Sequence, residues 1–248
     1  MCSVMCALIK WFVFAMLLSA RCIASSTQKL HASHSSRSNA RPPASKSTEA
    51  ALSIVTWNLA ECTPLVVDCN TIYECVGQSQ VICVGLQEVE SLSPRRSESR
   101  RSKLMRKRIR GAFSTTHKCI SQSTLGQTQL LVFVRKGSAI DIIAEWDVTC
   151  GIGNVVANKG ALGLVLRVGS LNIGIITAHL AAHQSKVQSR NDDFTRIMAS
   201  SAKYVRGLDG LLFGGDLNYR LDLMKEEVEL SLETNHEELL GYDQVRCS

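Results

Sequence analysis

The chain has 248 residues, of which 45% are hydrophobic and 20% are charged, so most of it is expected to be globular. The formal net charge is +6, but the window 94–118 contains ten Lys or Arg and one Glu, which leaves the rest of the chain near −3. The basic character therefore belongs to one segment, and the net charge does not mark the whole protein as a nucleic-acid binder. The ten cysteines include no Cys-x-x-Cys pair, so reduced structural thiols are expected rather than a zinc site.

Residues 1–24 are expected to be a signal peptide or an N-terminal membrane anchor. The run 4–20 is apolar apart from Lys10 and Ser19, and small residues follow it, as at a signal-peptide cleavage site. The run is short for a membrane span, which favours the signal peptide. Basic residues after it would keep the rest of an uncleaved chain in the cytosol, which favours the anchor. Residues 25–49 are rich in Ser, Ala and Arg and are predicted to be a disordered linker.

A globular domain is expected over residues 50–248, and its first two strands are predicted at Ser53–Trp57 and Val81–Leu86. These strands lead to Asn58 and Glu88. A Glu just past a buried strand is well placed as a hard oxygen ligand for Mg²⁺. Each residue alone is equally typical of an ordinary turn or helix start.

Most of the basic excess lies in Pro94–Arg110, whose large apolar residues are Leu104, Met105 and Ile109. This composition predicts at best a weakly amphipathic helix. A solvated, partly disordered insertion is favoured over a contact with an anionic membrane or a nuclear-import patch, because blocks of like charge are usually solvated.

Strands alternate with few helices in the rest of the chain, which indicates mixed sheets in a layered α/β domain. The pattern at Arg190–Arg206 predicts a helix with an apolar stripe that includes Phe194 and Ile197. An acidic helix is predicted at Lys225–Leu240, ended by Gly241. The remaining predicted strands are Gln127–Arg135, Ala139–Val148, Gly160–Val168, Leu171–His179 and Leu211–Phe213.

Four predicted strands lead to polar residues: Asn58, Glu88, His179, and Asp216 with Asn218. Together they supply carboxylates, amides and an imidazole, which is the set that phosphate-ester cleavage with one Mg²⁺ needs. The sequence contains neither the Cys-x5-Arg loop of cysteine phosphatases nor a Gly-x4-Gly-Lys-Ser/Thr loop.

The motifs around these residues resemble those of the inositol polyphosphate 5-phosphatases, within the endonuclease/exonuclease/phosphatase superfamily. The resemblance covers roughly residues 50–248 and implies a four-layer α/β sandwich with two packed mixed β-sheets. It also implies Mg²⁺-dependent removal of the 5-phosphate from phosphoinositide lipids or soluble inositol polyphosphates, with no nucleic acid expected as a partner. The matching stretches are Thr56-Trp57-Asn58, Gly85-Leu86-Gln87-Glu88, Asn158-Lys159-Gly160-Ala161, His179-Leu180-Ala181-Ala182-His183, Arg190-Asn191-Asp192-Asp193 and Gly214-Gly215-Asp216-Leu217-Asn218-Tyr219-Arg220.

The resemblance also implies roles for individual residues. Asn58 and Glu88 would hold the Mg²⁺. Asp216 and Asn218 would orient the attacking water and the scissile phosphate, and His179 would hydrogen-bond that phosphate. The remaining candidates would contact the anionic head group: Lys159, Arg190, Asn191, Tyr219 and Arg220. The alternative for Arg190 and Arg220 is pairing with nearby Asp residues.

The chain also departs from the family, because it lacks a Trp-Cys-Asp-Arg run and a closing Ser-Asp-His motif. The Asp-His pair of the latter belongs to the family's catalytic centre, so we expect a catalytic domain that is incomplete at its C-terminus. Two alternatives follow: a catalytically dead phosphoinositide-binding fragment and a nuclease of the same superfamily. We expect a membrane-associated protein with a cytosolic catalytic domain, or a protein of the secretory pathway if the N-terminal segment is a cleaved signal. The oligomeric state is left open.

Overall fold

The computed structural model describes residues 50–89, 100–151, 158–234 and 236–245. The expected signal peptide or anchor at 1–24 and the expected linker at 25–49 lie outside the described residues. None of the helices within these ranges is both long enough and apolar enough to cross a membrane.

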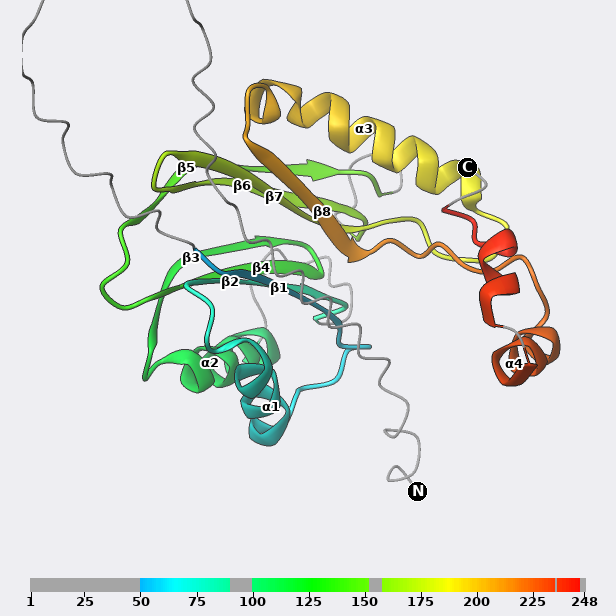
Figure 1. Ribbon diagram of the computed structural model, residues 1–248, viewed down its shortest axis with the longest axis horizontal. Helices are drawn as coiled ribbons and strands as arrows, with labels where there is room; N and C mark the ends of the chain where they lie inside the picture. Colours follow the sequence, from blue (N-terminus) through cyan, green and yellow to red (C-terminus); the bar gives the residue numbers. More distant parts are fainter. Residues whose placement is uncertain (1–49, 90–99, 152–157, 235, 246–248) are drawn as a thin grey trace, which may run out of the picture.

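In the described part of the chain, eight strands form two four-stranded sheets (Figure 1). The first sheet has the order β1-β2-β4-β3 and the second has the order β5-β6-β7-β8. The strand bounds are β1 Leu52–Asn58, β2 Val81–Gln87, β3 His117–Leu125, β4 Thr128–Arg135, β5 Ile140–Thr149, β6 Gly160–Val168, β7 Leu171–His179 and β8 Gly210–Asp216.

Each sheet contains one parallel pair, β1 with β2 and β7 with β8, and is otherwise antiparallel. Parallel neighbours need a crossover connection. These connections are α1 (Val66–Val76) in the first sheet and α3 (Val187–Val205) in the second. The carboxyl ends of each parallel pair therefore lie together, with Asn58 beside Gln87 and His179 beside Asp216.

The two sheets pack face to face, and the helices cover their outer faces (Figure 1). Apolar side chains such as Val132 and Leu164 fill the space between the sheets. Helix α1 and helix α2 (Arg100–Phe113) cover the first sheet, and α3 covers the second. Strands β2 and β4 are buried on both faces, which explains their nearly continuous apolar sequences. The predicted four-layer sandwich with two mixed sheets is confirmed.

The interpretation of the basic segment as a solvated insertion is wrong for residues 100–110, which belong to α2 (Arg100–Phe113). Its buried residues are Ser102, Met105, Ile109 and Phe113, spaced three or four apart on one helix face. Phe113 stacks on Phe133 of β4 with ring centroids 4.6 Å apart. One narrow buried face is enough to hold a strongly cationic helix against the sheet. Residues 94–99 lie outside the described residues.

Two further predictions need correction. The acidic segment is not one helix, because α4 (Lys225–Thr234) is followed by a 3₁₀ helix, η3 (His236–Tyr242), which includes Gly241. The stripe predicted for α3 buries Ile197, but Phe194 is 42% exposed and lies against the ring of Phe213.

Candidate active site

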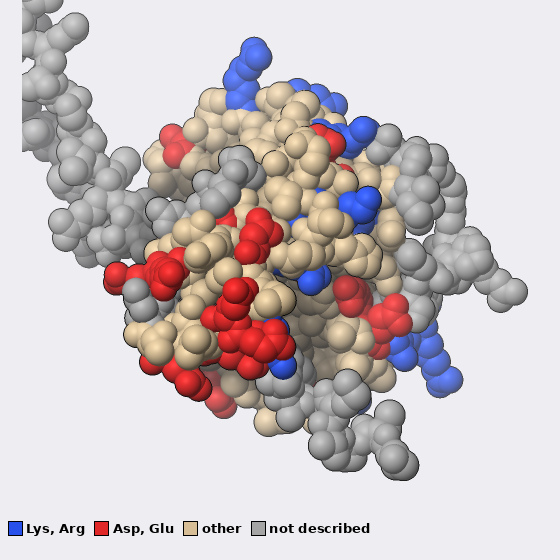
Figure 2. All heavy atoms as spheres, turned by 90° about the vertical axis from the view of Figure 1, so that its right-hand side faces the viewer, with Lys and Arg blue, Asp and Glu red and all other residues tan. Residues whose placement is uncertain are grey.

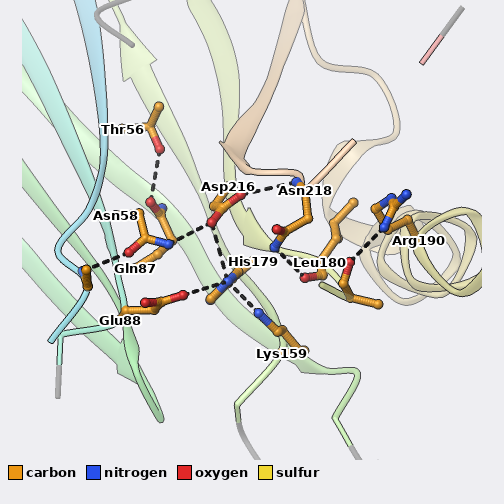
Figure 3. Close-up of polar contacts among 12 residues, drawn as sticks. Thr56, Asn58, Gln87, Glu88, Lys159, His179, Leu180, Arg190, Asp216 and Asn218 are labelled. Atoms are coloured by element: carbon orange, nitrogen blue, oxygen red, sulfur yellow. Dashed lines mark hydrogen bonds and ion pairs between the residues drawn. The ribbon is translucent and has the colours of Figure 1, made fainter. Parts of the chain in front are cut away.

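Four polar side chains from both sheets meet at the carboxyl ends of the parallel strands (Figure 3). Asn58, His179 and Asp216 are the last residues of β1, β7 and β8, and Glu88 follows β2 directly. Asn58 Nδ2 donates a hydrogen bond of 2.7 Å to Asp216 Oδ2, which joins the first sheet to the second. The sequence therefore identified side chains that the fold brings together.

The Asp216 carboxylate is held by donors on both of its oxygens. Asn58 donates to Oδ2, and the backbone N–H of Asn218 donates to Oδ1 at 3.1 Å. Asn218 has a positive φ of 57°, and its side-chain Nδ2 donates to the Leu180 carbonyl at 3.0 Å. A carboxylate oxygen has more than one lone pair, so Asp216 can still accept a hydrogen bond from a water.

Glu88 adopts a backbone conformation that is uncommon for a residue with a side chain. Its φ is 51°, in the left-handed region, and its carbonyl accepts from the Glu61 N–H at 2.8 Å. The side chain brings Oε1 to 3.9 Å from His179 Nε2 while the carboxylate stays about one-third exposed. Strained backbone of this kind clusters at functional sites.

His179 is buried at the centre of the site, with its Nε2 facing two carboxylates and one ammonium group. Nε2 lies 3.5 Å from Asp216 Oδ2 and 2.5 Å from Lys159 Nζ. Burial, helped by the Lys159 charge and opposed by Asp216, lowers the pKa of His179 to about 4. The imidazole is therefore neutral at neutral pH. Because Nε2 accepts from Lys159, the ring proton is placed on Nδ1, which is buried without a partner among the described residues.

Lys159 supplies the positive charge of the site. Burial lowers the pKa of its ammonium group, while Asp216, Glu88 and Asp193 act in the opposite direction. Lys159 was predicted to contact the substrate, and in the structure its ammonium group also contacts His179 Nε2. A hydrogen bond from His179 Nε2 to a phosphate therefore requires Lys159 to release that nitrogen and the ring proton to move from Nδ1 to Nε2.

The donor set fits a divalent metal ion. One ligand atom each from Glu88, His179 and Asp216 can be chosen so that all lie within 4.8 Å of one another. Two carboxylates are the hard oxygen donors that suit Mg²⁺. The amide oxygen of Asn58 instead accepts from the Ala60 N–H at 2.9 Å, and the amide nitrogen faces Asp216. The pairing of Asn58 with Glu88 as metal ligands stays a prediction.

Beneath the site, a buried amide links the two sheets, and sequence analysis gave it no role. Gln87 is fully buried; its Oε1 accepts from Thr56 Oγ1 at 3.2 Å and its Nε2 donates to Thr177 Oγ1 at 3.4 Å. Thr177 belongs to β7, two residues before His179. The available clue was a glutamine at the end of an otherwise apolar strand.

The remaining candidates form a second cluster around Arg190, which is fully buried. Its guanidinium group donates to the His183 carbonyl at 2.7 Å and to Gln244 Oε1 at 2.5 Å. It also lies over the ring of Tyr219, whose hydroxyl donates to Asn191 Oδ1 at 2.5 Å. These contacts with carbonyl and amide oxygens match neither the predicted contact with the head group nor its alternative, pairing with Asp side chains.

A structural role for Arg190 predicts that Arg190→Met lowers the free energy of unfolding by about 3 kcal/mol, because several buried acceptors lose their donor. Urea unfolding without any phosphate ligand measures this loss. Arg206→Met, an exposed change at the end of α3, is the matched control and should be nearly neutral. Unchanged stability of Arg190→Met together with weaker inositol phosphate binding would instead assign Arg190 to the substrate. Contacts of Arg220, which is exposed, with a substrate also stay a prediction.

One family model and several curated proteins match this chain. The family described as Endonuclease/Exonuclease/phosphatase family 2 matches residues 55–248. Synaptojanin-2 of Rattus norvegicus is 29% identical over 182 residues, which are 68% of this chain and 12% of the relative. Phosphatidylinositol 3,4,5-trisphosphate 5-phosphatase 1 of Xenopus laevis is 26% identical over 219 residues, which are 77% of this chain and 21% of the relative. The chain thus spans a small part of the length of these relatives.

A solved structure shows the same fold. It is the inositol polyphosphate 5-phosphatase domain of SPsynaptojanin in complex with inositol (1,4)-bisphosphate and calcium ion. The TM-score is 0.64 at 23% sequence identity, and the match covers 79% of this chain and 60% of that chain.

Proposed function

The chain belongs to the Endonuclease/Exonuclease/phosphatase family 2, and from this premise we propose that it is a Mg²⁺-dependent phosphatase that removes the 5-phosphate of phosphoinositides or inositol polyphosphates. The observation that carries the proposal is the convergence of Asn58, Glu88, His179 and Asp216 beside Lys159. Relatives named as 5-phosphatases, and a structure of the same fold bound to an inositol bisphosphate, support the same substrate class.

The negatively and positively charged side chains of the site have different roles in the proposed reaction. Asp216, fixed by Asn58 and Asn218, accepts a hydrogen bond from the attacking water and aligns it with the phosphorus atom. Lys159 turns from His179 to the phosphate and offsets the charge that builds up on its oxygens. His179 can then donate to the phosphate in the tautomer that carries its ring proton on Nε2.

Glu88 and Asp216, with Asn58 if its amide turns, are the residues that would hold Mg²⁺. A bound Mg²⁺ supplies electrostatic stabilisation of the phosphoryl oxygens. The related structure is a complex that contains calcium ion, which supports binding of a divalent metal, and the pair of hard carboxylates favours Mg²⁺ over softer metals.

We further propose that the protein works at a membrane surface, because phosphoinositide substrates are lipids. Residues 1–24 provide an apolar segment that would keep the domain near a bilayer as an uncleaved anchor or direct it to the secretory pathway as a cleaved signal.

Removal of the metal tests the proposal. Phosphate release from soluble inositol 1,4,5-trisphosphate should fall more than roughly 10²-fold on addition of EDTA and return with excess Mg²⁺, because charge neutralisation contributes several kcal/mol to such reactions. The organic product should be inositol 1,4-bisphosphate. Undiminished turnover in EDTA would contradict the metal dependence.

Two other outcomes identify the alternatives. Nicking of plasmid DNA without phosphate release from inositol substrates would assign the chain to the nucleases. Tight binding of inositol phosphates with no turnover under any metal condition would make it a phosphoinositide-binding protein.

A further inference from the structure

The start of α1 exposes three consecutive apolar side chains. Leu65, Val66 and Val67 are 60%, 58% and 61% exposed. The residues of α1 that are buried against the rest of the domain lie further along the helix: Cys69, Ile72 and Val76. The three side chains, called the apolar tip below, are therefore not needed for packing, and adjacent exposed apolar residues mark interaction sites.

Helix α2 carries a row of positive charges on its outer side. Arg100, Lys103, Lys107 and Arg110 are spaced three or four residues apart and are all exposed. This spacing places them on one helix face, away from the buried face that includes Met105. We call these four residues the cationic stripe.

Hydrogen bonds hold the segment before the apolar tip against α2, the helix that carries the cationic stripe. Arg108 Nη1 of α2 donates to the Pro64 carbonyl at 2.5 Å, and Arg101 Nη1 donates to the Glu61 carbonyl. The segment that leads into α1 is thus held along α2. Leu104, on the α2 face between these arginines and the stripe, is 43% exposed and extends the apolar area.

The same segment leads directly to the candidate active site. It starts at Asn58, whose Oδ1 accepts from the Ala60 N–H, and the Glu61 N–H donates to the Glu88 carbonyl. On the face at the right-hand side of Figure 1, most of the Asp and Glu spheres lie to the left, and a group of Lys and Arg spheres lies at the lower right (Figure 2).

We propose that the apolar tip and the cationic stripe dock the domain on an anionic lipid bilayer. Apolar side chains enter the boundary between head groups and acyl chains while Lys and Arg contact the anionic head groups. A nucleic acid would pair with the cations and leave the apolar tip without a role. The inference rests on the proposed function for its purpose, since docking here would bring lipid head groups to the strand ends.

Co-sedimentation of the full chain with vesicles tests the proposal independently of catalysis. Vesicles of phosphatidylcholine with 30% phosphatidylserine are compared with pure phosphatidylcholine, in EDTA and without inositol lipid. The ratio of the two binding constants cancels any contribution from the apolar residues 4–20. Each Lys or Arg near an anionic surface contributes roughly fivefold to binding, so Lys103→Glu/Lys107→Glu should lower the ratio at least about 25-fold. Val66→Ser/Val67→Ser should weaken binding to the anionic vesicles.

The matched control is Arg196→Glu/Arg206→Glu, which reverses one exposed charge on α3 and one directly after it and should bind like the wild type. The stripe and tip variants should also retain wild-type turnover of soluble inositol 1,4,5-trisphosphate. Wild-type binding by both variants, or equal loss in the control, would overturn the docking surface. Loss of DNA binding with unchanged vesicle binding would also overturn it. If phosphate release is absent while vesicle binding follows the expected pattern, the proposed function fails and the docking surface stands.

Discussion

Asp216→Asn should lower phosphate release by about 10²- to 10⁴-fold, the range associated with a carboxylate that positions or accepts a proton in the reaction. The change removes one negative charge and keeps the size of the side chain. The bond from Asn58 Nδ2 can persist, because an asparagine oxygen also accepts. Thermal unfolding should stay near the wild-type temperature or rise, because Glu88 and Asp216 no longer repel each other across the site.

The control for this substitution is Asp209→Asn, the same chemical change just before the opposite end of β8. Asp209 is exposed and accepts from the Asn172 N–H at 2.7 Å, a bond that asparagine can also accept. Turnover by this variant should be unchanged. Wild-type turnover by Asp216→Asn would refute the assignment of Asp216 to the reaction.

Gly215→Ala should lower the free energy of unfolding by about 3 to 5 kcal/mol, a large share of the stability of a typical domain. A Cβ at residue 215 would lie 2.0 Å from the Ala178 carbonyl oxygen of the neighbouring strand β7. The φ of Gly215 is also +129°, a conformation that side-chain-bearing residues rarely adopt. Strand β8 would have to move away from β7 next to Asp216.

The adjacent glycine provides the comparison. Apart from its two chain neighbours, no described residue places an atom within 4 Å of a Cβ added at Gly214, and the φ of Gly214 lies outside the left-handed region. Gly214→Ala should therefore change stability by much less than Gly215→Ala. Similar urea midpoints for the two variants would show that β8 absorbs the extra methyl group.

Sequence patterns were most informative for strands that are buried on both faces. Strands β2 and β4 are covered on both faces, so their apolar runs stand out. The polar residues that follow strand-like runs were identified as site candidates because together they supply the carboxylates, amides and imidazole that phosphate-ester cleavage needs. Strand β3 was missed, because it alternates buried and exposed positions with mainly polar residues and lacks an apolar period. Helix α1 was also missed, since its buried residues are few and its first turn is exposed.

Other features depend on contacts between distant segments. The basic composition of α2 concealed four buried residues, of which Phe113 contacts rings on three other elements: Tyr73 of α1, His117 of β3 and Phe133 of β4. The bond between Lys159 and His179 follows from the pairing of β6 with β7, which sets Gly160 opposite His179. Arg190 matches a family motif, yet its buried contacts with Gln244 join residues 54 positions apart. Local sequence contains none of this information.

Because the site is divided between two sheets, the rate of phosphate release should depend on the position of one sheet relative to the other. Asn58 and Glu88 belong to one sheet, His179 and Asp216 to the other, and the Gln87–Thr177 bond is a polar tie beneath them. Sliding one sheet by about 1 Å would misalign the water and the phosphate, and such errors cost roughly 10²-fold in rate. Substitutions in the apolar layer between the sheets, remote from any substrate, should therefore slow turnover well before they unfold the protein.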